Sequence, residues 1–140
     1  ELSVEKKNPL SLIFIDLDNF KNINDMFGHG AGDYILNQFS INTQKFIKND
    51  VDWIARYGGD EFLICLNNTN YERAKQIANK IKDKTNENNF IYKTKNIKLT
   101  CSLGVYTYSD YDNLIDLNEI IHRVDKILYK AKCEGRNCVM

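Results

Sequence analysis

Two hydrophobic periods alternate along the chain, and each predicts a different kind of element. The run from Leu10 is apolar almost without interruption until Asp16, which is typical of a central strand buried on both faces. From Ile97 to Val105 apolar residues occupy every second position, which predicts another strand, with residues 90–93 as its hairpin partner. Two further strand-like runs, 51–56 and 62–66, flank a Gly-Gly pair and predict a tight hairpin.

Helical spacing occupies the segments between these strands. A short helix is predicted over about residues 19–26, and a longer one that begins within residues 28–33 and keeps its apolar spacing as far as Ile47. Two more helices are predicted over about 71–84 and about 117–132, the last ending at Gly135. This order predicts a mixed α/β domain with hairpins, and it does not fit a regular alternation of strands and helices.

Composition narrows the class of protein. The 140 residues fit one domain, and 19 Lys+Arg balance 19 Asp+Glu, which argues against a generic basic surface for nucleic acid. No run of apolar residues is long enough for a transmembrane helix, so we expect no direct membrane contact by this segment. The polar start does not resemble a signal peptide, and Cys65 and Cys101 lie in apolar runs that are typical of buried free thiols. These features favour a cytoplasmic domain.

Acidic residues gather where predicted strands end. Asp16 and Asp18 close the first strand, and Asp60 and Glu61 follow the Gly-Gly pair. Carboxylates at strand ends can converge on Mg²⁺, which prefers oxygen ligands. A solvated hairpin tip is the simpler interpretation of Gly-Gly-Asp-Glu alone, but acidic residues that end a buried apolar strand favour a site.

Four segments together resemble the GGDEF family, the bacterial diguanylate cyclases. They are Arg-Tyr-Gly-Gly-Asp-Glu-Phe at 56–62, Asp-Leu-Asp-Asn-Phe-Lys-Asn-Ile-Asn-Asp at 16–25, Gly-His-Gly-Ala-Gly-Asp at 28–33, and Ala-Lys-Cys-Glu-Gly-Arg-Asn at 131–137. The resemblance implies an α+β palm-like fold, similar to nucleotidyl cyclases, with a central, mainly antiparallel sheet flanked by helices. It also implies condensation of two GTP into cyclic di-GMP, with release of two pyrophosphates.

The same resemblance assigns the metal and catalytic positions. It implies two Mg²⁺ (or Mn²⁺) ions per active site, held by the carboxylates of Asp16 and Asp60 and by the backbone carbonyl of Leu17. Asp60 or Glu61 is expected to deprotonate the ribose 3′-hydroxyl. We favour Asp60 as the base with Glu61 in support, although the sequence does not separate them.

Substrate positions follow from the matched motifs as well. Asn24 and Asp33 match the pair that reads guanine, whose N1–H and N2–H₂ donors suit a carboxylate; a helix cap is the alternative for Asp33. The other expected substrate contacts are the cations Lys21, Lys132 and Arg136, the backbone amides of Asn19 and Phe20, and the open backbone of Gly58 and Gly59. Without the resemblance, Lys132 and Arg136 are ordinary cations at a helix C-terminus.

Two departures from the family pattern shape the expectations. The product-binding Arg-x-x-Asp motif reads Asn49-Asp-Val-Asp52 here, so we expect weak or absent feedback inhibition. The usual segment ahead of the first strand does not occur between Glu1 and Pro9. We therefore interpret residues 1–8 as a residual linker from an upstream sensory region and residues 9–140 as the GGDEF domain. Catalysis is expected to need a homodimer, and the parent protein can be membrane-anchored.

Three other functions fit the sequence less well than a cyclase does. A non-catalytic GTP-binding or signalling module is the main alternative, but the intact Asp16 and Gly-Gly-Asp-Glu-Phe favour an enzyme. A hybrid synthase that also uses adenine is disfavoured because Asp33 suits guanine. A polymerase-like function is disfavoured by the neutral charge.

Overall fold

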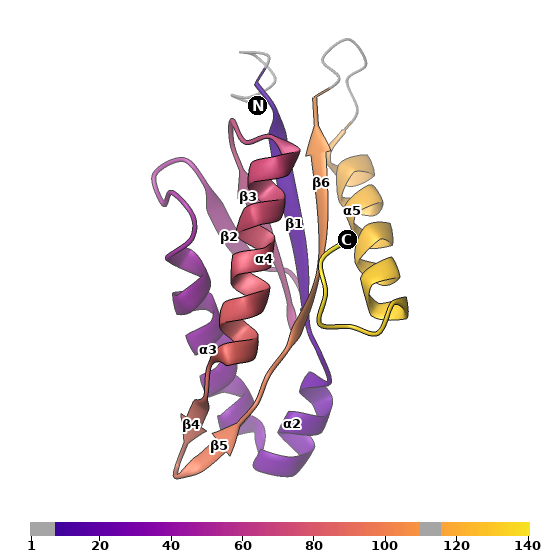
Figure 1. Ribbon diagram of the computed structural model, residues 1–140. Coiled ribbons are helices and arrows are strands. Elements are labelled where there is room, and N and C mark those ends of the chain that lie inside the picture. Colours follow the sequence, from indigo (N-terminus) through magenta and orange to yellow (C-terminus); the bar gives the residue numbers. More distant parts are fainter. Residues whose placement is uncertain (1–7, 110–115) are drawn as a thin grey trace.

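A four-stranded antiparallel sheet forms the centre of the computed structural model, which describes residues 8–109 and 116–140 (Figure 1). Its strands lie in the order β2-β3-β1-β6. The sheet strands are β1 (Leu10–Leu17), β2 (Trp53–Arg56), β3 (Glu61–Leu66) and β6 (Cys101–Tyr108), and β4 (Phe90–Tyr92) with β5 (Lys95–Ile97) forms a separate hairpin. The helices are α2 (Phe20–Phe27), α3 (His29–Gln44), α4 (Tyr71–Glu87) and α5 (Leu117–Cys133). The expected mixed fold with a mainly antiparallel sheet is confirmed.

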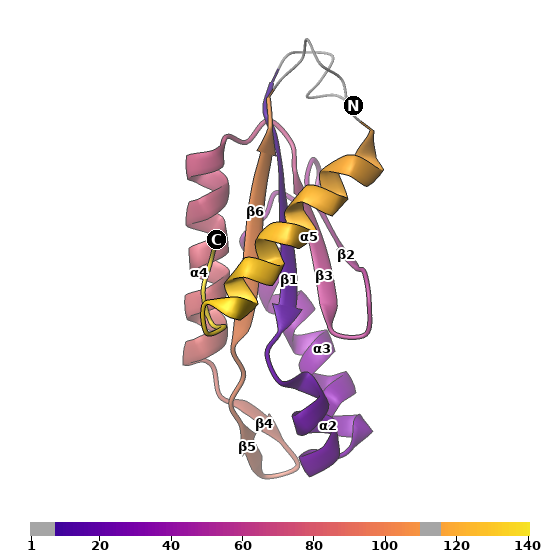
Figure 2. The ribbon, with the colours of Figure 1, turned by 90° about the vertical axis from the view of Figure 1, so that its right-hand side faces the viewer.

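The apolar run of β1 is explained by helices on both faces of the sheet. Ile13 and Ile15 pack with α3 and α4 in one core cluster, whereas Leu12 and Phe14 pack with α5 in the other. All eight residues of β1 are buried. In Figures 1 and 2 α5 crosses the face of the sheet opposite to α4, so β1 lies at the centre of three layers. A continuous apolar strand is the pattern that such a position requires.

Helix α5 lies unusually close to β6 because of a glycine. A Cβ atom built on Gly104 would lie 2.6 Å from the backbone nitrogen of Leu128 and 3.0 Å from the carbonyl oxygen of Val124. Only a residue without a side chain permits this approach. The contact fixes the position of α5, which carries Lys132 in its last turn.

The helices begin close to the predicted residues, but α3 ends earlier than its apolar pattern. It stops at Gln44, so Phe46 and Ile47 lie beyond it, although both still pack against the core. Gly135 stops α5 as expected, at a φ of 107°. None of the helices in the described ranges is long and apolar enough to cross a bilayer. The expected linker, residues 1–8, lies outside the described residues except for Asn8.

The hairpin expected for residues 90–93 is present, with Phe90 opposite Ile97, but its second strand begins earlier than predicted and ends at Ile97. That segment pairs with β5 through a two-residue turn, Lys93 and Thr94, both at positive φ, and not with β6. The alternating stretch from Ile97 to Val105 is split, because residues 98–100 leave the sheet and the Thr100 carbonyl accepts a hydrogen bond of 2.9 Å from Asp18 N–H. Alternation alone does not reveal such a break, since apolar residues continue on both sides of it.

The turn between β2 and β3 also differs from the prediction. Tyr57–Asp60 form a four-residue connection in which neither Gly58 nor Gly59 has a positive φ, so the glycines do not serve a tight two-residue turn. The backbone N–H groups of Tyr57 and Gly58 both donate to the Glu61 carbonyl, at 2.8 and 3.3 Å. The glycines are therefore not explained by turn geometry. At Gly59 the absence of a side chain leaves the backbone open to a ligand, as described below.

Cys65 and Cys101 are buried free thiols, as expected. Burial raises the pKa of Cys65 to about 11 and that of Cys101 to about 12. Both therefore stay protonated at neutral pH and act as small apolar core residues.

Candidate active site

Two acidic strand ends meet at one edge of the sheet. Because β1 and β3 are antiparallel neighbours, Asp16 lies directly opposite Glu61. The backbone N–H of Leu17 donates to the carbonyl of Asp60 at 3.0 Å, which holds the start of β3 against the end of β1. The pairing thus brings Asp16 together with Asp60 and Glu61, which lie more than 40 positions later in the sequence.

The carboxylate of Asp16 is buried and only half satisfied. Its Oδ2 pairs with the ammonium group of Lys132, while its Oδ1 is buried without a hydrogen-bond partner among the described residues. The pKa of Asp16 is raised to about 6, mainly by burial and also by the nearby charges of Asp60 and Glu61, against the opposing effect of Lys132. A buried oxygen of this kind is a costly feature that calls for a ligand.

A divalent cation fits this arrangement. The unpartnered Oδ1 of Asp16 is an available hard ligand, and Asp60 lies close enough to influence its charge. The described residues hold no group of three or more His, Cys, Asp or Glu side chains arranged for a metal ion. A Mg²⁺ site does not need one, because Mg²⁺ typically takes one or two carboxylates and completes its shell with water and substrate phosphates.

Asp18 has a different role from Asp16. Its two oxygens accept hydrogen bonds from Thr100 Oγ1 at 2.7 Å, Ser102 Oγ at 2.7 Å and the backbone N–H of Asn137 at 3.0 Å. This network joins the end of β1 to β6 and to the loop after α5. Asp18 is therefore a structural residue that fixes the backbone around the site.

A cavity of about 280 Å³ opens beside the acidic edge. It brings together residues from α2, α3 and the β2–β3 connection that lie up to 40 positions apart in the chain. The residues that line it are Phe20, Lys21, Asn24, His29, Asp33, Leu36, Arg56, Gly59 and Asp60. Six of these nine were expected at the site, so the cavity unites most of the motif positions.

Asp33 is not a helix cap. The N-cap of α3 is Gly28, and Asp33 lies one turn inside the helix with its side chain exposed to the cavity. Asn24 reaches the same cavity because of a glycine: a Cβ on Gly32 would lie 1.9 Å from Asn24 Oδ1. The two candidate base-reading side chains thus line one cavity from different helices.

The β2–β3 connection is held by Arg56, which the sequence analysis assigned no role. Its guanidinium donates to the carbonyl of Gly58 at 3.2 Å and to that of Gly59 at 3.2 and 2.7 Å. A Cβ at Gly59 would meet nothing within 4 Å, so the backbone there is open to a ligand. The position of Arg56 two residues before the Gly-Gly pair is the only feature of the sequence that could have indicated this role. Its partners are two backbone carbonyls, which a pattern of side chains does not reveal. His29 and Leu36 were likewise not assigned to the substrate.

The other expected residues, among them Lys132, Arg136 and Asn19, are not among the described residues that line the cavity. Lys132 contacts Asp16, as described above. Arg136 is exposed in a left-handed conformation, with φ 65°, and it is not among the described cavity-lining residues. Asn19 caps α2 with a φ of 55°, and the first N–H groups of α2 have no partner within the helix. These amides are available to an anion.

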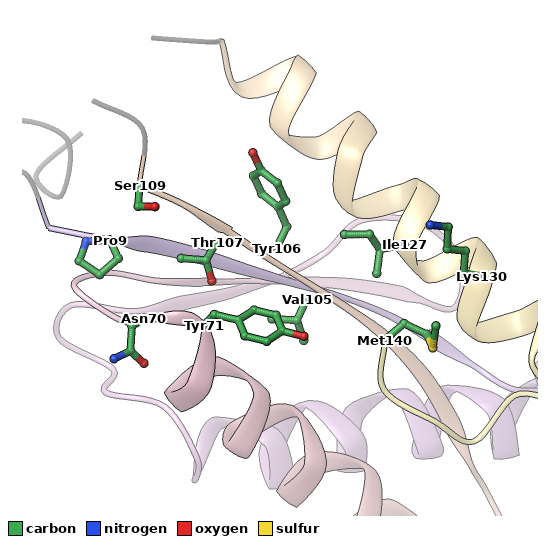
Figure 3. A pocket seen from close by; sticks show the side chains of 10 residues that line it. All are labelled: Pro9, Asn70, Tyr71, Val105, Tyr106, Thr107, Ser109, Ile127, Lys130 and Met140. Carbon is green, nitrogen blue, oxygen red and sulfur yellow. The ribbon is translucent and has the colours of Figure 1, made fainter. Parts of the chain in front are cut away.

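A larger cavity of about 820 Å³ lies far from this chemistry (Figure 3). It lies between the start of α4 and α5, beside the end of β6 that is opposite to Asp16. Its lining residues are Pro9, Asn70, Tyr71, Val105, Tyr106, Thr107, Ser109, Ile127, Lys130 and Met140, none of which is acidic. Size therefore does not identify the site in this fold; the acidic edge does.

Solved structures of the same architecture define the class of protein. A structure described as the active GGEEF domain of a diguanylate cyclase from Vibrio cholerae matches with a TM-score of 0.86 and 38% identity, over 99% of this chain and 86% of that one. A GGDEF domain from Pseudomonas aeruginosa matches with a TM-score of 0.89 and 28% identity, over 98% of this chain and 84% of that one. The fold is that of the palm-like cyclase domains.

Sequence comparison gives the family itself. The model of the family described as "Diguanylate cyclase, GGDEF domain" matches residues 1–138, and the chain belongs to this family. Diguanylate cyclase A of Treponema denticola is 43% identical over 137 residues, and a diguanylate cyclase of Vibrio cholerae is 40% identical over 131 residues. These alignments cover 98% and 94% of this chain, but only 36% and 39% of the two relatives.

Proposed function

We propose that this domain is a diguanylate cyclase that condenses two GTP into cyclic di-GMP and two pyrophosphates across a homodimer. The observation that carries the proposal is the cavity in which Lys21, Asn24 and Asp33 lie beside the buried, half-satisfied carboxylate of Asp16. This combination offers a base-reading end, a phosphate-binding cation and a cation-binding carboxylate in one place. The family membership of the chain supports the same reaction.

Guanine binds at the end of the cavity that Asn24 and Asp33 line. The Asp33 carboxylate accepts hydrogen bonds from guanine N1–H and N2–H₂, and the Asn24 amide adds polar contacts to the base. Adenine lacks that donor pair, so Asp33 favours GTP over ATP. A polar group placed for one base discriminates strongly because the wrong base leaves it unpaired.

The triphosphate lies toward the cationic residues. Lys21 lines the cavity, Lys132 lies in the last turn of α5 against Asp16, and Arg136 follows in the loop after α5. The backbone N–H groups of Asn19 and Phe20, at the start of α2, add donors to phosphate oxygens. Gly58 and Gly59 let the nucleotide approach the backbone of the β2–β3 connection.

The reaction joins the ribose 3′-oxygen of each GTP to the α-phosphorus of the other, so the same step occurs twice and releases two pyrophosphates. Asp60, supported by Glu61, takes the proton of the attacking hydroxyl, the new P–O bond forms, and the bond to pyrophosphate breaks. Asp16, Asp60 and the Leu17 carbonyl would hold two Mg²⁺ (or Mn²⁺) ions, which would supply the positive charge that such a transfer requires. Each domain holds one GTP, so two domains must face each other, and one domain alone should turn over slowly.

Nucleotide competition tests the substrate. A fluorescent GTP analogue is bound with Mg²⁺ and displaced by GTP or ATP. We expect GTP to compete at least about tenfold better than ATP, and Asp33→Ala to remove most of this preference. Asp25→Ala, which removes an exposed aspartate of α2 that does not line the cavity, is the matched control and should change nothing. Equal competition by ATP and GTP in the unaltered domain would contradict the proposal.

A further inference from the structure

Lys132 lies where a metal ion is expected, not where a phosphate is. Its ammonium group pairs with Asp16 Oδ2, although Lys132 was assigned to the triphosphate. Burial alone would lower the pKa of Lys132, but Asp16, Glu61 and Asp60 together raise it. Asp16 and Asp60, the two carboxylates expected to hold divalent cations, therefore both act on this ammonium group, and Asp16 contacts it directly.

This pairing opposes metal binding by the empty site. An ammonium group on Oδ2 neutralises part of the charge that would attract a cation to Oδ1 of the same carboxylate. Two positive charges a few ångströms apart in a partly buried site repel each other strongly. A divalent cation therefore gains less at Asp16 while Lys132 stays there.

A triphosphate provides an alternative partner for the same ammonium group. The Lys132 side chain is a flexible four-carbon stem in the last turn of α5, and its side chain is 31% exposed, so it can move toward the cavity side. Phosphate oxygens offer it strong charge-assisted hydrogen bonds. Departure of Lys132 then leaves both oxygens of Asp16 available.

We propose that Lys132 takes the place of a metal ion at Asp16 in the nucleotide-free domain and moves to the triphosphate when GTP binds, so that metal and nucleotide binding favour each other. This inference rests on the proposed function for its nucleotide. It predicts that the domain takes up metal together with GTP and binds little metal before it. The coupling is reciprocal, so bound metal favours nucleotide binding as much as bound nucleotide favours metal binding. Removal of Lys132 should weaken nucleotide binding but strengthen metal binding to the nucleotide-free site.

Metal affinity measured without nucleotide is the direct test. Mn²⁺ binding to the unaltered domain, Lys132→Met and Lys130→Met is followed by electron paramagnetic resonance of free Mn²⁺. We expect Lys132→Met to bind Mn²⁺ about tenfold more tightly than the unaltered domain, since this is the size of a typical coupling. Lys130→Met removes an equal charge from the same helix turn, where the side chain is exposed and away from Asp16, and should bind Mn²⁺ as the unaltered domain does.

Two further variants and one further ligand complete the design. Lys132→Gln repeats the test with a polar side chain, and Lys132→Arg, which keeps the cation, should leave Mn²⁺ affinity low. With a non-hydrolysable GTP analogue present, the gain in Mn²⁺ affinity caused by nucleotide should be smaller in Lys132→Met than in the unaltered domain. Circular dichroism confirms that each variant is folded.

The inference is overturned if Lys132→Met and Lys132→Gln bind Mn²⁺ no more tightly than the unaltered domain, or if Lys130→Met shows the same gain. Failure of the proposed function looks different. In that case the unaltered domain does not bind the GTP analogue, whatever the variants do with Mn²⁺ alone.

Discussion

Asp16 and Asp18 are two residues apart and both buried, yet their carboxylates meet opposite surroundings. Asp18 accepts three hydrogen bonds, whereas Asp16 has one ion pair and one unpartnered oxygen. Without a ligand, the first arrangement stabilises the fold and the second destabilises it. An unpartnered oxygen of this kind is consistent with the proposed cation site, where a bound ion would satisfy it.

The two residues should therefore respond in opposite ways to loss of charge. In metal-free buffer near pH 8, Asp16→Asn should raise the free energy of unfolding, because ionisation of the buried carboxylate is removed. The pKa rise from 3.8 to about 6 corresponds to at most about 3 kcal/mol. Asp18→Asn should lower the free energy of unfolding by about 1 to 3 kcal/mol, because it weakens a buried network. Urea denaturation of both variants measures this.

The effect of Asp16 on the free energy of unfolding should depend on pH. Because the folded-state pKa of Asp16 is raised, the folded domain binds the proton more tightly than the unfolded chain does. The stability associated with this group is complete below about pH 4 and is lost as the pH rises through about 6. The advantage of Asp16→Asn should consequently disappear near pH 4. An Asp16→Asn variant that is less stable at pH 8 would contradict this account of the site.

Arg56 acts on the backbone of the signature connection. Its guanidinium joins the carbonyls of Gly58 and Gly59, and it is exposed, so its loss should change the free energy of unfolding by less than about 1 kcal/mol. We expect Arg56→Gln to lower kcat/KM by about tenfold or more, because a displaced Asp60 no longer meets the hydroxyl. Arg56→Lys should restore little, since one ammonium cannot reproduce the planar fork. A kcat/KM unchanged in Arg56→Gln would remove this role.

Two glycines have different roles in the packing of elements: Gly104 permits α5 to lie close to β6, whereas Gly59 leaves the backbone of the β2–β3 connection open. Gly104 lies under α5, where a Cβ would meet backbone atoms at 2.6 and 3.0 Å, so Gly104→Ala should lower the free energy of unfolding by about 2 kcal/mol or more. Gly59 faces open space at negative or extended φ, so Gly59→Ala should leave stability nearly unchanged while it reduces turnover. Thermal unfolding and activity of the pair distinguish the two effects. Equal stability of both variants would show that α5 does not depend on this contact.

The segment that matches the family's product-binding motif, Asn49-Asp-Val-Asp52, lies in the connection between α3 and β2. Both oxygens of Asp52 are used internally, accepting from the N–H groups of Lys48 at 3.0 Å and Asn67 at 2.9 Å. With Asn49 in place of the family arginine, we expect cyclic di-GMP to inhibit weakly or not at all. Isothermal titration with cyclic di-GMP and initial rates with added product measure this. Inhibition at low micromolar product would contradict the expectation.

The hydrophobic pattern of the sequence predicts some elements of the fold and not others, and the reason differs between them. The buried strand β1 and the amphipathic helices α4 and α5 were predictable, because their hydrophobic period is continuous. The break between β5 and β6 was not, because it depends on hydrogen bonds between Thr100 and Asp18, which is distant in the chain: Asp18 N–H donates to the Thr100 carbonyl, and Thr100 Oγ1 donates to the Asp18 carboxylate. The cavity positions were predictable only as motif members. The Lys132–Asp16 pair required the actual packing of α5 against the sheet.

At the scale of the whole molecule, the neutral charge conceals a local separation. Asp16, Asp60 and Glu61 concentrate negative charge at one end of the sheet, and Lys132 faces all three. The opposite end holds the larger, non-acidic cavity. The proposed two-domain reaction would require the acidic edges of two domains to face each other.

Identification of the reaction product is the decisive test of the proposal that this domain forms cyclic di-GMP from GTP. The domain is fused to a parallel two-stranded coiled coil that supplies dimerisation, incubated with GTP and Mg²⁺, and its products are identified by mass spectrometry. We predict cyclic di-GMP and pyrophosphate from the unaltered fusion, and neither from Asp60→Asn. Cyclic di-GMP formed at the same rate by Asp60→Asn, or a different product from the unaltered fusion, would contradict the account.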